Sequence, residues 1–199
     1  MGLINKNVLK RTLSKQAGPI LEKKIIPQLE KQFEQAKKAA LQDFESHAVT
    51  QELEEGPTAS NKSGTLRGRG NLHSFIGFEK GENPIAKLRE LLASKITIQN
   101  RVARKGEMVF YIKVGIPSDE DIENVTQVPW APGRSWARGI EEGLSGLGNY
   151  LIKDSDASRS GTAIQIEATV GDSSFSTTSY LTKIIGDLVA ALEQNIKIQ

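Results

Sequence analysis

The sequence predicts an α+β fold in which a long N-terminal helix precedes an antiparallel β-sheet, and an amphipathic helix ends the chain. Three patterns predict this fold: apolar residues at steps of three or four over residues 21–44, strict apolar alternation over residues 108–116, and helical spacing again over residues 181–196. We expect a basic helical extension over residues 1–27 and a single α+β domain over residues 28–199.

The N-terminal helix is indicated by one apolar stripe, formed by Leu21, Ile25, Leu29, Phe33, Ala36, Ala40 and Phe44. Gly18 and Pro19 are expected to break or kink the helix, and Pro27 to bend it or start a new one. We therefore expect a weak helix near residues 4–16 and a long one that ends at about Ser46. The first 24 residues hold six Lys or Arg against a single acid. They form either a solvated basic arm or an arm that docks on an acidic protein surface or DNA.

Two shorter helices are predicted next. Residues 49–55 form a short helical turn, which Gly56 and Pro57 end. Asn83 and Pro84 form a typical helix start, with a side-chain cap followed by proline at the first helical position. This second helix is expected to run to about Ser94.

A glycine-rich segment lies between these helices. Gly64, Gly68 and Gly70 are typical of turns, since glycine reaches backbone angles that other residues avoid. The three cations of this segment are Lys62, Arg67 and Arg69. Behind it, the apolar run Phe75-Ile76-Gly77-Phe78 predicts the start of a buried strand.

A β-hairpin follows, with a turn at Lys105-Gly106 and its end at Pro117. Ile96, Ile98 and Val102 are expected to share one face, and the partner strand alternates through Met108, Phe110, Ile112, Val114 and Ile116. An acidic loop over residues 119–123 comes next.

The C-terminal third contains both tryptophans. Trp130 lies between Pro129 and Pro132, and Trp136 begins a helical spacing that extends to Tyr150. Residues 154–161 predict an exposed loop and residues 164–170 a strand. The final helix is marked by Leu181, Ile184, Ile185, Leu188, Val189, Leu192 and Ile196.

Motifs for catalysis or metal binding are not found. The chain has no cysteine, and its two histidines are 26 residues apart without a partner at ligand spacing. Phosphate-binding and nucleophile-elbow motifs do not occur. We therefore expect no enzyme activity, no cofactor and no metal. Net charge is +2, no apolar run is long enough for a membrane span, and the N-terminus lacks a signal-peptide pattern. A cytoplasmic site of synthesis without membrane contact is expected.

Three short motifs carry a family resemblance. Ser63-Gly64-Thr65-Leu66-Arg67-Gly68 resembles the glycine-loop signature of tailed-bacteriophage neck and tail-completion proteins, such as relatives of minor tail protein Z. Residues 136–143 resemble that family's aromatic and IExG element. Thr178-Ser179-Tyr180-Leu181 resembles its PFL-like element but lacks the proline. The order of elements matches over residues 30–199.

The resemblance implies a virion structural protein that forms a ring at the head–tail junction, around the DNA channel. Its implied partners are copies of itself in a hexamer or dodecamer, neighbouring neck, connector or tail-tube proteins, and the genomic DNA. Its implied location is the virion neck or tail, after assembly in the host cytoplasm. The helix at residues 84–95 and the segment 117–129 are longer than in a minimal member, so the position in the particle stays open.

The residues that we expect in the assembly interface are Arg67, Arg69, Asp119, Glu120, Asp121, Trp130 and Trp136, with Gly64, Gly68 and Gly70 shaping the loop. For both tryptophans the alternative is core packing. The basic arm and the acidic segment are complementary in charge, as expected for a contact between different faces of neighbouring subunits. Two other functions remain open: a nucleic-acid-binding accessory protein without sequence specificity, and a hydrolase or transferase whose site has no recognisable motif.

Overall fold

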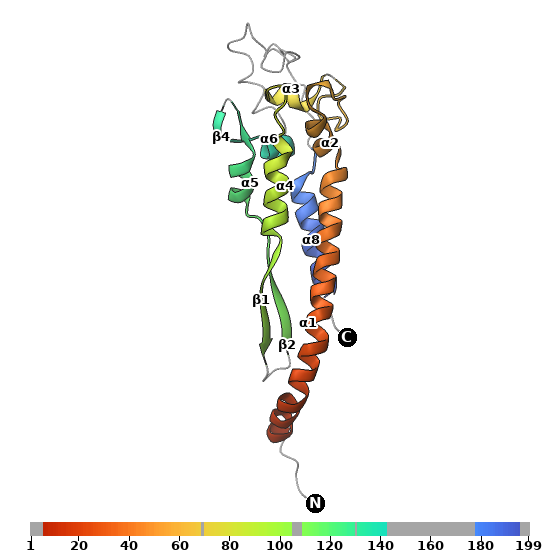
Figure 1. Cartoon of the computed structure of the whole chain (residues 1–199), viewed down its shortest axis with the longest axis vertical. Helices are drawn as coiled ribbons and strands as arrows, with labels where there is room; N and C mark the ends of the chain where they lie inside the picture. Colours follow the sequence, from red (N-terminus) through yellow and green to blue (C-terminus); the bar gives the residue numbers. More distant parts are fainter. Residues whose placement is uncertain (1–5, 69, 105–108, 130, 143–177, 196–199) are drawn as a thin grey trace, which may run out of the picture.

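The computed structural model describes residues 6–68, 70–104, 109–129, 131–142 and 178–195, and it has the predicted α+β architecture (Figure 1). The molecule is elongated. The three longest helices among the described residues are α1 (Lys6–Ser46), α4 (Pro84–Lys95) and α8 (Leu181–Asn195). They lie side by side in the middle of the molecule, with short helices and loops at one end and a β-hairpin at the other (Figure 1).

The N-terminal helix is one element of 41 residues, where the sequence predicted two. Gly18, Pro19 and Pro27 all lie inside α1 and do not end it. A proline removes one backbone hydrogen bond and bends a helix, but it need not end one, and the helical backbone of α1 continues through both prolines. At 1.5 Å per residue, α1 is about 60 Å long, which is twice the diameter of a small domain.

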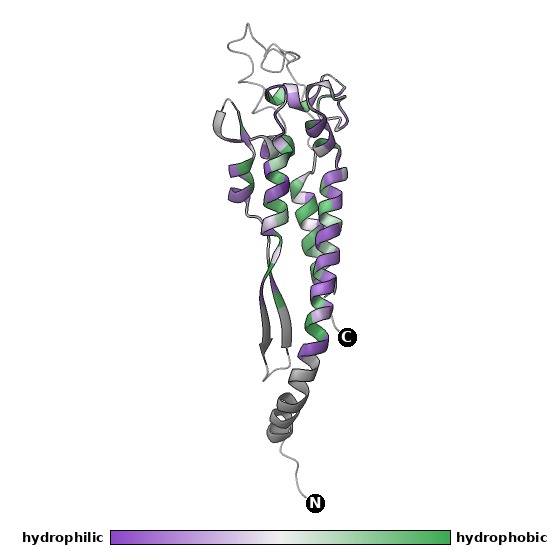
Figure 2. Cartoon of the chain, viewed as in Figure 1, coloured by the Kyte–Doolittle hydropathy of each residue, from purple (hydrophilic) through white to green (hydrophobic). Residues whose placement is uncertain are grey.

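The apolar core runs along the side of α1 that faces the other two long helices. The α1 stripe is buried as predicted from Leu29 to Phe44, and Ile25 is half-buried. In Figure 2 the exposed side of α1 is mostly hydrophilic, whereas α8 beside it is mostly hydrophobic. The core residues from the partner helices are Ile85, Leu88 and Leu92 of α4 and Leu181, Ile184 and Leu188 of α8. The three helices therefore bury one continuous apolar surface.

The predicted hairpin is formed by β1 (Thr97–Arg104) and β2 (Val109–Gly115), which pair antiparallel and lie beside the N-terminal half of α1 (Figure 1). The register shifts between Ile98 and Asn100, so that one extra residue is inserted in β1. After such a bulge the alternation of faces changes by one position. Val102 pairs with Tyr111 and not with a residue of the Ile98 face, so the predicted common face of Ile98 and Val102 is wrong.

The segment after the glycine-rich loop is helical, which corrects the predicted strand. Residues Leu72–Ile76 form α3, capped by Asn71, whose side chain accepts a hydrogen bond from the Ser74 N–H. Gly77 ends the helix at φ = +89°, a left-handed conformation that glycine adopts readily. Leu72, Phe75 and Ile76 are all buried, as the helical spacing of three and four residues allows. The preceding α2 (Ala48–Glu55) agrees with the prediction, and it ends at Gly56 as expected; the 3₁₀ turn Gly56–Thr58 that follows was not predicted.

The acidic segment is also a helix where a loop was predicted. Ser118 and Asp121 form a reciprocal capping box that starts α5 (Asp119–Val125). A small hairpin of β3 (Gln127–Val128) and β4 (Ala131–Ser135) follows, and α6 (Trp136–Glu142) comes next. This hairpin was not predicted, because its strands are short and contain Pro132 and Gly133.

Some predictions lie outside the described residues: the turn at Lys105-Gly106, the helical spacing beyond Glu142, the loop at 154–161, the strand at 164–170 and the end of the last helix at Ile196. In the part of the chain that the structure describes, no helix is both long and apolar enough to cross a lipid bilayer.

Candidate assembly interface

The glycine-rich loop is held in place by the carboxylate of Glu52, which is fully buried. Its two oxygens accept hydrogen bonds from the Ser63 N–H at 2.8 Å, the Leu72 N–H at 2.7 Å and the Asn61 side-chain amide at 3.0 and 3.2 Å. One side chain from α2 therefore ties both ends of the loop together. A buried carboxylate is tolerated only with several hydrogen-bond donors, and Glu52 has them.

Two asparagines complete this anchoring. The side-chain oxygen of Asn61 accepts hydrogen bonds from the Leu66 and Gly68 N–H groups, both at 3.1 Å. Asn71 donates its side-chain amide to the carbonyl of Pro57 at 2.7 Å. The backbone N–H groups of Ser63, Leu66, Gly68 and Leu72 are therefore already bound within the chain.

The three loop glycines all have positive φ, +69° at Gly64, +77° at Gly68 and +67° at Gly70. Arg67 also has a positive φ of 53°, which is uncommon for a residue with a side chain. The loop thus turns repeatedly through conformations that favour glycine. The sequence indicated these turns, but Glu52 and Asn61, which determine the loop's position, were missed because ordinary polar residues carry no motif.

The cations of the loop differ in their surroundings. Arg67 is exposed, and α2 and α3, which flank its loop, lie at the end of the molecule opposite the β1–β2 hairpin (Figure 1). Lys62 forms an ion pair with Glu55 at the end of α2. Arg69 lies outside the described residues. The structure therefore places Arg67 on the surface and pairs Lys62 within the chain.

The acids of α5 divide into two groups. Asp121 accepts hydrogen bonds from Lys95 Nζ at 2.7 Å and from the Ser118 N–H, and these contacts, Lys95 first, lower the pKa of Asp121 to about 2. Glu123 accepts a hydrogen bond from Arg138 at 2.9 Å. Asp119 and Glu120 are exposed, and neither contacts a cation within the described part of the chain. Within the described part of the chain, Asp119 and Glu120 are therefore the α5 acids without an ion pair.

Trp136 is a core residue, so the structure corrects its predicted place in an interface. Its side chain is 1% exposed and meets the ring of Phe78 edge-on, with ring centres 6.3 Å apart. The alternative of core packing is the one that the structure supports. Trp130 lies outside the described residues, and nothing in the structure tests its predicted role.

The two histidines are bound to backbone groups and do not approach each other. His47 caps α2 by accepting a hydrogen bond from the Val49 N–H, and its Nε2 lies 3.2 Å from the carbonyl oxygen of Ser179. Burial lowers the pKa of His47. His73 is fully buried, with Nε2 3.1 Å from the carbonyl oxygen of Glu82. Among the described residues no group of three potential metal ligands comes together.

The start of α8 is fixed by groups from two other helices. Glu141 of α6 accepts hydrogen bonds from the Tyr180 N–H at 3.2 Å and from the Thr182 N–H at 2.8 Å. A carboxylate at this position satisfies unpaired N–H groups and the positive end of the helix dipole. Tyr180 is fully buried, and its hydroxyl lies 2.7 Å from that of Thr50 in α2. These contacts join α8 firmly to the loop end of the molecule.

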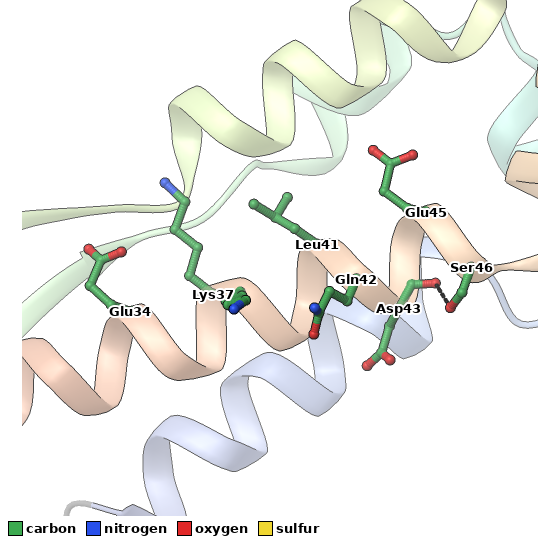
Figure 3. A pocket seen from close by; sticks show the side chains of 8 residues that line it. Glu34, Lys37, Leu41, Gln42, Asp43, Glu45 and Ser46 are labelled. Carbon is green, nitrogen blue, oxygen red and sulfur yellow. Dashed lines mark hydrogen bonds between the residues drawn. The ribbon is translucent and has the colours of Figure 1, made fainter.

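A shallow, open groove follows α1 through the middle of the molecule (Figure 3). Lys37, Leu41 and Glu45 point toward α4, where Lys37 donates to the carbonyl of Ala93 at 2.9 Å and Glu45 binds Arg89. The other lining residues are Glu34, Lys38, Gln42, Asp43 and Ser46. An open groove with mixed charges and one apolar residue does not enclose a small molecule and has no arrangement for acid–base chemistry.

The strongest charge feature is the end of the molecule that contains residues 6–28 of α1 together with β1 and β2, which we call the basic arm. It carries the single acid Glu22 against nine cations, Lys6, Lys10, Arg11, Lys15, Lys23, Lys24, Arg101, Arg104 and Lys113. The whole chain holds 26 Lys and Arg and 24 Asp and Glu residues, so 17 cations and 23 acids lie elsewhere. The formal charge is therefore +8 on the arm and −6 on the rest.

Comparison with protein-family models, with curated proteins and with solved structures found no match to this chain. The interpretation of the interface therefore rests on the sequence and the geometry described above.

Proposed function

We propose that this chain is a structural subunit that assembles with further copies of itself into a ring, at the head–tail junction of a tailed bacteriophage. The observation that carries the proposal is the basic arm. It extends beyond the α1–α4–α8 bundle as one helix and a two-stranded hairpin. An isolated two-stranded hairpin is only marginally stable in water; this hairpin packs against α1, and contact with a neighbouring subunit would stabilise it further.

The charge distribution supports the same proposal. The net charge of the chain is near zero, but it is divided into a positive arm and a negative remainder along an elongated molecule. This division favours contacts between different ends of successive copies. Contacts between different faces generate closed rings when the rotation between copies closes, as in a hexamer or dodecamer. In such a ring a cationic surface next to the central hole would also suit passing genomic DNA. Neighbouring neck, connector or tail-tube proteins would bind the two rims, and the subunit would end in the virion neck or tail.

A second candidate is an accessory protein that binds nucleic acid without sequence preference. The observation that favours it is the excess of nine cations over one acid on the arm. Cations that neutralise phosphates release counterions, so this binding would weaken steeply as salt increases. Affinity for a random-sequence duplex at 50 and 200 mM salt measures that dependence.

The test of the ring proposal is mass photometry of the purified full chain over a range of concentrations, with negative-stain imaging of the largest species. We expect a discrete oligomer with a central hole wide enough for duplex DNA. The same sample with duplex DNA, and with DNA-filled phage heads that lack tails, tests assembly on a template. A protein that stays monomeric alone, on DNA and on heads contradicts the proposal. Salt-sensitive DNA binding by that monomer would support the second candidate instead.

A further inference from the structure

We infer that the basic arm of one copy docks on the acidic body of the next copy, with Asp119 and Glu120 of α5 as its anionic partners. This inference rests on the proposed function and specifies the contact by which the ring is made. It is derived from three features: the apolar residues at the base of the arm, the division of charge along the molecule, and the ion pairs that α5 already makes.

The base of the arm is apolar as well as cationic. Ile25 and Ile26 on α1 are half-buried, whereas Ile98, Ile112 and Val114 on the hairpin already pack with part of their surface against the core of the same chain. Ile116, which follows the last residue of β2, is 42% exposed. Among the described residues it is the most exposed large apolar side chain. Contact with β-branched side chains contributes no binding energy to a phosphate group, whereas a protein partner can bury these side chains. A surface of this mixed composition favours a protein partner over nucleic acid.

The charge division disfavours a symmetric contact between two arms. Two arms placed together would bring +8 against +8, and like charges across an interface cost several kcal/mol. The remainder of the same chain carries −6 and attracts the arm. The favoured partner is therefore the body of a second copy. Because arm and body are different surfaces, the contact is head-to-tail and leads to a ring or an open filament.

Within the body, α5 offers an acidic surface whose geometry is fixed by internal contacts. Its helix is held to α4 by the ion pair of Lys95 with Asp121, and to α6 by that of Arg138 with Glu123. The capping box of Ser118 and Asp121 fixes its first turn. Asp119 and Glu120 stand exposed on this fixed turn and contact no cation within the described ranges. They can bind a lysine of another copy without breaking an internal ion pair.

The test uses two charge-reversed variants of the full chain that complement each other. The arm variant carries Lys23→Glu and Lys24→Glu, two exposed residues of α1. The body variant carries Asp119→Lys and Glu120→Lys. Matched controls change exposed charges elsewhere in the described surface, Lys87→Glu on α4 and Glu193→Lys on α8. Circular dichroism and urea unfolding of each variant confirm that it is folded before assembly is measured.

We expect each variant alone to assemble at roughly tenfold or more higher concentration than the wild type, because each places like charges in the contact. Mixing the two variants should restore assembly, since the reversed arm then meets the reversed body. Both controls should assemble like the wild type. Wild-type assembly should also weaken as salt rises, as the charges are exposed.

The outcomes separate this inference from the proposed function. If the wild type forms rings and both variants do so equally well, the head-to-tail contact is wrong while the ring proposal stands. If the mixture does not recover assembly, arm and body are not partners, and the inference is likewise overturned. If the wild type fails to associate alone, on DNA or on phage heads, both proposals fall. Loss of duplex binding in the arm variant, without any change in self-association, would assign the arm to nucleic acid.

Discussion

Replacement of Glu52 by glutamine is the most informative single change in this structure. Glu52→Gln keeps the shape of the side chain but exchanges one acceptor oxygen for an NH₂ group. The Leu72 N–H donates to Oε1 at 2.7 Å and the Ser63 N–H donates to Oε2 at 2.8 Å. Whichever way the new amide is turned, one of these backbone donors meets another donor. The substitution therefore leaves one buried N–H without an acceptor.

The cost follows from the burial of this site. An unsatisfied buried polar group costs about 1–3 kcal/mol, and hydrogen bonds to a charged group contribute about 1.5–3 kcal/mol each. Since Glu52 is fully buried, solvent cannot replace the lost bond. We expect Glu52→Gln to lower the free energy of unfolding by about 2–4 kcal/mol. Glu52→Ala should cost more, because it also leaves a cavity and removes every acceptor of the cluster.

The assay is equilibrium urea unfolding of the full chain, combined with amide hydrogen exchange of residues 61–72. Glu55→Gln is the matched control, since Glu55 lies on the same helix but is exposed and forms a surface ion pair with Lys62. The control should change the free energy of unfolding by less than about 1 kcal/mol. Faster exchange should be confined to the glycine-rich loop and α3 when Glu52 is changed.

The reasoning would be refuted by a Glu52→Gln protein within about 0.5 kcal/mol of the wild type, with unchanged exchange at Ser63 and Leu72. Equal losses for Glu52→Gln and Glu55→Gln would also contradict it, because burial would then play no part.

Three further predictions concern the helix contacts. Burial lowers the pKa of His47 below its ordinary 6.5. Below about pH 6.5 the unfolded chain therefore binds the proton more readily than the folded chain, and stability falls until the pH has passed the folded pKa. His47→Asn keeps a capping side chain and should reduce the loss of melting temperature between pH 7.5 and 5.5. Glu141→Ala removes the cap of α8 and should cost about 1–2 kcal/mol in urea unfolding, with Glu142→Ala as the exposed control. Trp136→Ala should cost about 3–5 kcal/mol, whereas an interface tryptophan would unfold normally and lose only assembly.

Long periodic patterns allowed much of the fold to be predicted from sequence. The α1 stripe from Leu29 to Phe44, the helix that begins at Asn83 and Pro84, the β1–β2 hairpin and α8 all occur as expected. Each is specified by local chemistry: apolar spacing, a cap, or alternation across a turn. These signals need no knowledge of what the element packs against.

The errors share one cause, which is competition between a short pattern and a specific contact. Phe75, Ile76 and Phe78 suit a strand equally well, but the Asn71 cap and Gly77 make the segment a helix. The acids at residues 119–123 are typical of a loop, but the side chain of Ser118 caps a helix at this position. The bulge near Gln99 moves Val102 to the other face of the hairpin. Over a few residues, one hydrogen bond outweighs the average propensity.

The candidate interface shows the same division. The sequence alone determined that the chain has a basic N-terminal arm, an acidic segment and a turn-rich glycine loop, because charge and glycine content are properties of composition. Only the tertiary structure decided that Trp136 is enclosed by the core, that Asp121 is paired with Lys95, and that Glu52 holds the loop from a distance of up to 20 positions along the chain. Burial and pairing depend on which distant residues meet, and that is established only when the chain has folded.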